Sequence, residues 1–268
     1  MPLATTLAEY IRAAFSGLYL ETQEPAEALR ELAELCRQEH WTLATWDIDQ
    51  GLQLLSSVNP VSVAATDPLA ALRSLPALAT PDRTTLFVLS NFHRFLNSAE
   101  IVQALQHQLL AGKATRTFVV ILAPTVQLPL ELERQFVVLT HELPHREQLA
   151  QIARDLAPDE SSSGAAWESL LDAAAGLTRY EAEGAFALSL ARHDALRPEA
   201  VWELKAQTLR KQNLLTLCRG GETFGSLGGL AALKEFCRRA LQPSRSVKAR
   251  GTLLLSPPGC GKSAFCRA

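Results

Sequence analysis

Eight consecutive residues near the end of the chain have the types and spacing of a phosphate-binding loop: Ser256-Pro-Pro-Gly-Cys-Gly-Lys-Ser263. Gly259 and Gly261 allow a turn that points backbone N–H groups toward an anion. Lys262 would bring a positive charge to phosphate oxygens, and the Ser263 hydroxyl could ligate Mg²⁺. The pattern expects glycine at the first position and finds Ser256, so we expect the loop to begin with different dihedrals or a small strain.

A loop of this kind is positioned by a buried strand before it and a helix after it. The apolar run Gly251-Thr-Leu-Leu-Leu255 predicts the strand, and the loop should open directly into a helix. Further upstream, apolar residues recur at helical spacing and predict one amphipathic helix through Leu230, Leu233, Phe236 or Cys237, and Leu241.

The first 140 residues contain short apolar runs that predict strands. The last three are nearly continuous in apolar residues, which is typical of strands buried on both faces of a parallel sheet. The five runs are 18–22, 42–46, 85–89, 117–122 and 136–139. Helical periodicity fills the gaps, with starts expected at Pro25, Ser98 and Pro144. Alternating strands and helices predict a three-layer α/β domain.

A polar hinge over residues 159–164 separates this domain from a segment without strand patterns. Trp167, Leu170, Leu171 and Ala174 share one helical face. Thr178 has the capping-box spacing to Glu181, and Pro198 can begin a third helix. We therefore expect a small helical bundle.

Composition supports a folded chain of about two domains, or one domain and an incomplete one. The chain has 268 residues, of which 47% are hydrophobic and 20% charged. No apolar run approaches the ~18 residues that cross a bilayer, and the N-terminus lacks a signal-peptide pattern, so a cytoplasmic protein without a membrane anchor is expected. The five cysteines form no C-x-x-C pair, which favours reduced thiols over structural zinc.

Charge is distributed unevenly along the chain. Residues 201–250 hold ten Lys or Arg against three acidic residues, whereas the overall net charge is −2. Only Trp202, Phe224 and Phe236 interleave with these basic residues, too few for a platform on which nucleic-acid bases stack. A solvated basic surface or a nucleotide partner accounts for this pattern better than nucleic acid does.

The sequence resembles the AAA+ ATPases at the phosphate-binding loop, which is similar to their Walker A motif, and at Phe224-Gly-Ser-Leu-Gly-Gly-Leu-Ala-Ala-Leu-Lys234. More specifically, it resembles the AAA+ family encoded as a hypothetical reading frame in algal chloroplasts and cyanobacteria, with relatives in other bacteria. Three further segments carry this resemblance: 46–51, 91–96 and 176–182.

The resemblance implies ATP and Mg²⁺ as cofactors. Ser263 would hold the metal, and the backbone near Leu227 and Gly228 would border the adenine. The phosphate-side residues implied are Ser256, Pro257, Pro258, Gly259, Cys260, Gly261, Lys262 and Ser263. In a complete form, the family relationship further implies a homo-oligomer that hydrolyses ATP to remodel a protein partner.

The domain boundaries that follow from this interpretation divide the chain into four parts. They are a degenerate AAA-like α/β domain without Walker motifs (1–158), a helical lid (165–212), a linker (213–223) and the start of an AAA+ module (224–268). The predicted fold class is thus a parallel-sheet, P-loop-NTPase-like α/β domain with a helical lid, followed by the beginning of a second AAA+ domain.

The first domain can be interpreted as a degenerate domain of the same fold that has lost its nucleotide-binding motifs. Its phosphate-loop position contains Glu21-Thr-Gln-Glu-Pro25, which has no glycine or lysine and should repel nucleotide. Ser90-Asn91 stands where an acidic pair would hold Mg²⁺, and Thr125 is the one polar candidate after the fourth run. An unrelated α/β domain with its own ligand is the alternative.

The chain ends five residues after the loop, without an acidic strand end, sensor, arginine finger or lid for the second module. As given, it is therefore expected to lack catalytic residues and not to hydrolyse ATP. The leading hypothesis is the N-terminal part of an AAA+ ATPase. The alternative is a non-catalytic protein-interaction module over residues 1–212 with a vestigial loop.

One further motif, His141-Glu-Leu-Pro-His145, matches the H-E-x-x-H pattern of zinc proteases. That chemistry needs both histidines on one face of a helix. Pro144 interrupts a helix there, so we interpret this segment as a strand exit followed by a helix start.

Overall fold

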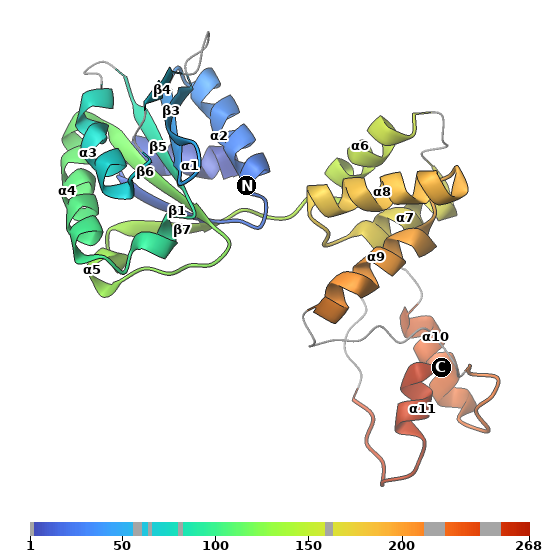
Figure 1. Ribbon diagram of the computed structural model, residues 1–268. Coiled ribbons are helices and arrows are strands. Elements are labelled where there is room, and N and C mark those ends of the chain that lie inside the picture. The colour runs from blue at the N-terminus through green and yellow to red at the C-terminus, as the bar shows by residue number, and fades with distance from the viewer. Residues whose placement is uncertain are drawn as a thin grey trace. The chain divides into compact units, whose positions relative to one another are not determined.

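A computed structural model of the chain describes residues 3–55, 61–63, 66–79, 83–158, 163–211, 223–241 and 253–268. The chain divides into two compact units, Met1–Val201 and Trp202–Ala268 (Figure 1). The predicted linker 213–223 lies almost entirely outside the described residues. The domain boundaries expected from the sequence stay a prediction.

The first unit contains one seven-stranded sheet with the order β4-β3-β2-β5-β6-β1-β7. Its strands are β1 (Gly17–Glu21), β2 (Thr42–Asp47), β3 (Gly51–Leu55), β4 (Val61–Val63), β5 (Thr85–Ser90), β6 (Thr117–Ala123) and β7 (Phe136–Thr140). The five strands from β2 across to β7 are parallel, whereas β3 and β4 extend the sheet in antiparallel pairing beside β2.

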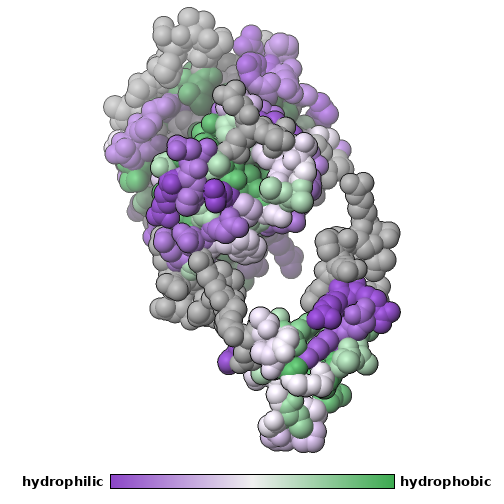
Figure 2. Space-filling model, turned by 90° about the vertical axis from the view of Figure 1, so that its right-hand side faces the viewer, coloured by the Kyte–Doolittle hydropathy of each residue, from purple (hydrophilic) through white to green (hydrophobic). Residues whose placement is uncertain are grey.

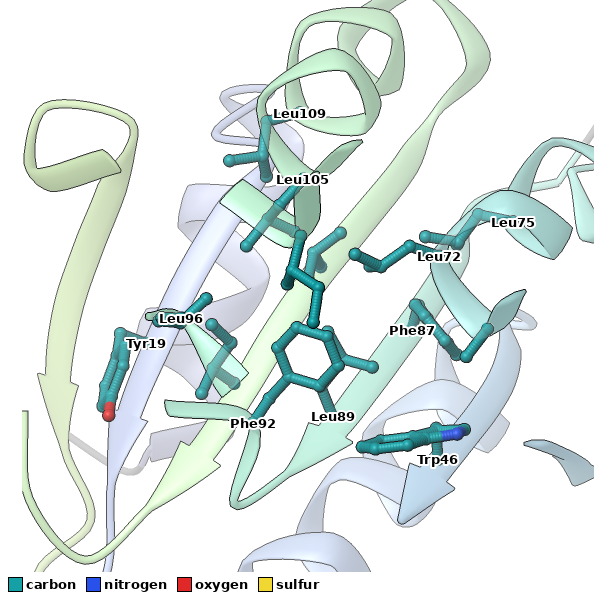
Figure 3. Packing of buried hydrophobic residues seen from close by; sticks show 14 of the residues in the cluster. Tyr19, Trp46, Leu72, Leu75, Phe87, Leu89, Phe92, Leu96, Leu105 and Leu109 are labelled. Carbon is teal, nitrogen blue, oxygen red and sulfur yellow. The ribbon is translucent and has the colours of Figure 1, made fainter. Parts of the chain in front are cut away.

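Helices cover both faces of this sheet. The sheet domain contains α1 (Leu3–Arg12), α2 (Pro25–Gln38), α3 (Pro68–Leu78), the 3-10 helix η1 (Phe92–Phe95), α4 (Ala99–Thr115) and α5 (Leu130–Glu133). Side chains of α1 and α2 form one core with one face of the sheet, and those of α3, η1 and α4 form a second core with the other. Figure 3 shows the second core, a cluster to which Trp46 and Phe87 of the sheet and Leu72 and Leu105 of the helices belong.

The predicted three-layer α/β fold is therefore confirmed, with each of the five predicted strands present. The apolar runs predicted β5 and β6 correctly because both strands are buried along nearly their whole length. Strands β3 and β4, the two antiparallel strands at one edge, were not predicted from the sequence. A helix start was predicted at Pro144, whereas α6 begins at Arg146 with His145 as its N-cap.

A helical segment follows the sheet, as expected. It contains α6 (Arg146–Leu156), α7 (Ala165–Ala174), α8 (Arg179–His193) and α9 (Pro198–Lys211), the last of which continues into the second unit. The predicted face of α7 is buried, and Thr178 and Glu181 form the predicted capping box at the start of α8. Arg146 joins α6 to α7 by ion pairs of 2.5 Å with Glu168 and Asp172.

The described residues of the second unit add the helix α10 (Ala231–Leu241) and the short helix α11 (Lys262–Arg267). Helix α10 covers the predicted amphipathic segment except Leu230, which precedes the helix with a positive φ, and α11 follows the phosphate-binding loop directly. Among the described parts of the chain, no helix is both long enough and apolar enough to cross a bilayer.

The buried position of Cys36 in α2 predicts a difference in thiol reactivity. Its side chain is 3% exposed, and burial raises the pKa of the thiol to about 12, so thiolate is scarce at neutral pH. Cys260 and Cys266 are exposed. Iodoacetamide at pH 8 should alkylate Cys260 and Cys266 of the folded protein while sparing Cys36, as measured by peptide mass spectrometry. Equal labelling of Cys36 and Cys260 before urea is added would contradict this burial.

Candidate functional site

The phosphate-binding loop turns at its two glycines. Gly259 and Gly261 have φ angles of +81° and +76°, in the left-handed region that favours glycine. A Cβ at either position would meet nothing within 4 Å, so the space beside each glycine is open. Ser256 is not among the described residues with positive φ, so its backbone does not adopt the left-handed conformation found at the two glycines.

Lys262, the first residue of α11, folds back over the start of the loop. Its ammonium donates hydrogen bonds to the carbonyl oxygens of Ser256 and Pro257, each at 2.8 Å, and to the Ser256 hydroxyl at 3.1 Å. Ser256, the departure from the glycine pattern, thus supplies two of the three acceptors. The positive charge lies at the loop itself, where phosphate oxygens could replace these acceptors.

Ser263, the expected metal ligand, is the second residue of α11 and is exposed. A hydroxyl oxygen is a hard ligand suited to Mg²⁺, and in the phosphate-loop pattern a Ser or Thr at this position holds the ion together with substrate phosphates. The donor types present therefore fit a magnesium nucleotide, with Lys262 and Ser263 adjacent in the chain.

An aromatic pair joins α11 to the segment before α10. The rings of Phe265 and Phe224 stack with centroids 5.1 Å apart and planes inclined by 24°. The guanidinium of Arg238 lies 5.5 Å from the Phe224 centroid, a cation–π arrangement. Phe265 is the buried residue of α11, so this stack fixes the helix that carries Lys262.

Leu227 and Gly228, the expected adenine border, lie between Phe224 and α10. The Leu227 carbonyl accepts a hydrogen bond from Lys234 of α10, and the backbone then turns through positive φ at Gly229 and Leu230. The structure thus gives these two residues a fixed place beside α10. Their contact with a base stays a prediction.

The strand predicted before the loop is wrong over its described residues. Residues 253–255 are described and form no strand, and Leu253 and Leu255 are 81% and 85% exposed. In the lower part of Figure 2, green hydrophobic residues lie at the surface of the second unit. A β-strand needs a neighbour to pair with its backbone, and no described residue pairs with this segment. The residues are apolar, as a buried strand requires, but an apolar pattern does not show whether a neighbouring strand is present.

A second set of polar residues gathers in the first unit, where the carboxyl ends of β1 and β7 meet. A cavity of about 590 Å³ there is lined by acidic and histidine side chains among others, including Glu24, Glu31, His141, Glu142 and His145. Residues 21–25 were expected at this position, but the residues that surround them come from distant parts of the chain and have no local pattern.

The two histidines of the H-E-x-x-H motif do not share a helix. His141 follows β7, and its Nδ1 lies 2.8 Å from the Thr22 hydroxyl oxygen. His145 is the N-cap of α6. Neither the helical spacing nor the shared face that this motif requires is present, as Pro144 indicated.

These features define a class of protein. A parallel sheet with helices on both faces, a helical segment after it, and a glycine-rich loop that ends in Lys-Ser at a helix start are the features of an AAA+ ATPase. Among solved structures, the chain is similar to the FIGL-1 AAA domain in complex with ADP, with a TM-score of 0.50 at 16% identity over 84% of this chain and 78% of that one. This likeness concerns the fold.

The family is shown directly by the sequence. The model of the N-terminal domain of SpoVK-like AAA ATPases matches residues 3–141, and the model of their second domain matches residues 146–212. The chain belongs to the SpoVK-like AAA ATPases.

Its curated relatives include two AAA domain-containing proteins described as uncharacterized ycf46. That of Trieres chinensis is 25% identical over 85% of this chain and 48% of its own length. That of Guillardia theta is 24% identical over 94% of this chain and 52% of its own length. The chain therefore spans about half the length of the relatives that it matches.

Proposed function

We propose that this chain is the N-terminal part of an AAA+ ATPase that binds ATP through residues 256–263 and, in a complete form, couples ATP hydrolysis to remodelling of a protein partner. Three observations support the proposal: the family of the chain, the two open glycine turns, and the ammonium of Lys262 above the loop. The position of Lys262 carries it, because this group would neutralise phosphate charge.

Each residue has a proposed role in this site. Lys262 would contact the terminal phosphates, the N–H groups of the turn at Gly259, Cys260 and Gly261 would surround them, and Leu227 with Gly228 would border the adenine. Ser263 would hold Mg²⁺, which neutralises phosphate charge when bound. The structural neighbour FIGL-1 is described in complex with ADP, which agrees with a nucleotide ligand for this class of fold.

The remodelling activity, the protein substrate and the homo-oligomer belong to the longer form of the protein. They are proposed from the family alone, because the chain spans about half the length of the relatives that it matches. ATP binding is the part of the proposal that this chain can test.

The proposal predicts that ATP binding depends on Mg²⁺ through Ser263. Calorimetric titration should give tighter ATP binding with Mg²⁺ than with EDTA, and Ser263→Ala should remove about tenfold of that affinity, equivalent to about 1.4 kcal/mol, because a metal ligand is lost. Affinity in EDTA should change little. Ser98→Ala is the matched control, since Ser98 is exposed and its side chain makes no capping hydrogen bond.

The proposal fails if the chain binds no ATP in either buffer. If ATP binds but Ser263→Ala and Ser98→Ala behave alike with Mg²⁺, the assignment of Ser263 as metal ligand is wrong.

A further inference from the structure

The loop that follows β1 lies at a position where α/β sheets usually bind ligands. In the sheet, β1 stands between β6 and β7. The chain leaves β1 for β2 on the far side of β5 and β6, and later crosses from β6 past β1 to β7. Such a reversal of strand order places the carboxyl end of β1 at a topological switch point, the usual ligand position of an open parallel sheet.

A carboxylate of the chain itself is buried at this point. Glu24, immediately before α2, is 8% exposed. Its Oε1 atom accepts a hydrogen bond from the backbone N–H of Arg179, the first residue of α8. The first N–H groups of a helix have no partner within the helix, and they bind anions well. Glu24 therefore occupies the place of an anionic ligand at the start of α8.

The loop around Glu24 is held by a second set of hydrogen bonds. The backbone N–H of Glu24 donates to the Thr22 hydroxyl at 2.9 Å, and that hydroxyl can donate to Nδ1 of His141 at 2.8 Å. The backbone N–H of His141 donates to the Glu21 carbonyl at 2.9 Å, which continues the pairing of β1 with β7. These bonds hold the backbone of Glu24 at the carboxyl edge of the sheet, from which its side chain reaches α8.

The charges around this position disfavour an external anion. Four glutamates line the 590 Å³ cavity, namely Glu24, Glu27, Glu31 and Glu142, and Arg179 is the one Arg or Lys among the described residues that line it. The Arg179 guanidinium is itself paired with Glu183 at 2.8 Å. A nucleotide phosphate entering here would meet several carboxylates with no lysine to offset them.

The pKa of Glu24 agrees with a buried carboxylate that needs partners. Burial raises this pKa, while the hydrogen bond from Arg179 and the charge of His141 lower it, and Glu27 raises it further. Burying a carboxylate without a hydrogen-bond donor is unfavourable, so the contact with α8 offsets part of the cost.

We propose that Glu24 is an internal ligand that replaces nucleotide in the first domain and holds the start of α8 against the carboxyl edge of the sheet. In this arrangement the helical segment is attached to the α/β domain by the chain itself and needs no nucleotide. The first domain is then a fixed structural module, while nucleotide binding is left to the loop 256–263. This inference does not depend on ATP binding at that loop.

Hydrogen exchange at one backbone amide tests the proposal in the full chain. The Arg179 N–H has no partner within α8, so its protection depends on Glu24. Glu24→Ala should speed exchange of this amide roughly tenfold or more, whereas amides of β1 and β6 should exchange as before. Glu24→Gln keeps an oxygen acceptor without charge and should give an intermediate rate. Glu142→Ala removes an exposed carboxylate of the same cavity and should have no effect at Arg179.

The proposal is overturned if the Arg179 amide exchanges at the same rate in wild type and Glu24→Ala, or if Glu142→Ala accelerates it equally. Should Glu24→Ala not fold, Glu24→Gln decides, and an unchanged rate in that variant overturns the proposal. A second arm adds ATP with Mg²⁺ to the Lys262→Ala variant. No change in exchange over residues 21–25 is expected there, and protection of that loop by nucleotide would show that the position still binds it.

Discussion

Replacing Lys262 with alanine is expected to weaken ATP binding by roughly tenfold to a hundredfold, because hydrogen bonds between charged partners contribute about 1.5–3 kcal/mol each. The Lys262 ammonium already lies over the loop, on the carbonyls of Ser256 and Pro257. Binding ATP would exchange these neutral acceptors for phosphate oxygens, which form stronger, charge-assisted bonds. Lys262 would lose its hydrogen bonds to the two carbonyls when it binds phosphate, and this loss offsets part of the gain in binding free energy. We therefore expect a loss of affinity near tenfold rather than a hundredfold.

Titration with a fluorescent ATP analogue would measure the effect. Lys113→Ala is the matched control, since it removes the same charge from an exposed position on α4 of the first unit. Affinity should be unchanged in that variant. If both substitutions leave ATP affinity at the wild-type value, the loop is not the nucleotide site, whatever its sequence resembles.

The parts of the fold that the sequence predicted are those controlled by local chemistry. Buried parallel strands are apolar along their length, so β5 and β6 were recognisable without any knowledge of their neighbours. Helix starts at Pro25 and Pro198 were predicted because proline suits the first helical turn, and both helices begin there.

The missed hairpin had a local signal that could have revealed it. The Asp47 side chain accepts hydrogen bonds from the backbone of Asp49 and Gln50, an Asx turn, and Gly51 follows with φ of +71°. Strand β3 after this turn is only partly buried, so its apolar pattern is weak. A search for turn chemistry would have predicted this pair of strands, whereas hydrophobic periodicity did not.

The polar contacts of the first unit could not be predicted from pattern at all. Thr22 and His141 are 119 residues apart, and Glu24 and Arg179 are 155 residues apart. The residue types of the loop after β1 already indicated that it lacks phosphate-binding residues and contains carboxylates. Which helix those carboxylates meet is a consequence of the whole topology, because strand order and crossovers determine it.

Replacing Trp46 with alanine is expected to destabilise the first unit by about 3–5 kcal/mol, the usual range for a large aromatic side chain removed from a core. Trp46 of β2 is 1% exposed. Its ring makes edge-to-face contacts with Phe92 at 5.3 Å and Phe95 at 5.7 Å, both in η1 after β5 (Figure 3 labels Trp46 and Phe92). Total stabilities of about 5–15 kcal/mol are typical, so this loss is a large fraction.

Urea unfolding of the full chain, followed by circular dichroism, would measure the free energy of unfolding in each variant. Trp46→Phe keeps one aromatic ring against η1 and should lose clearly less than alanine does. Ile48→Ala is the control, because Ile48 lies two residues away and is 59% exposed, and it should change the free energy by about 0.5 kcal/mol or less. Equal losses from Trp46→Ala and Ile48→Ala would mean that β2 does not pack against η1. The placement of η1 directly after β5, against β2, would then be wrong.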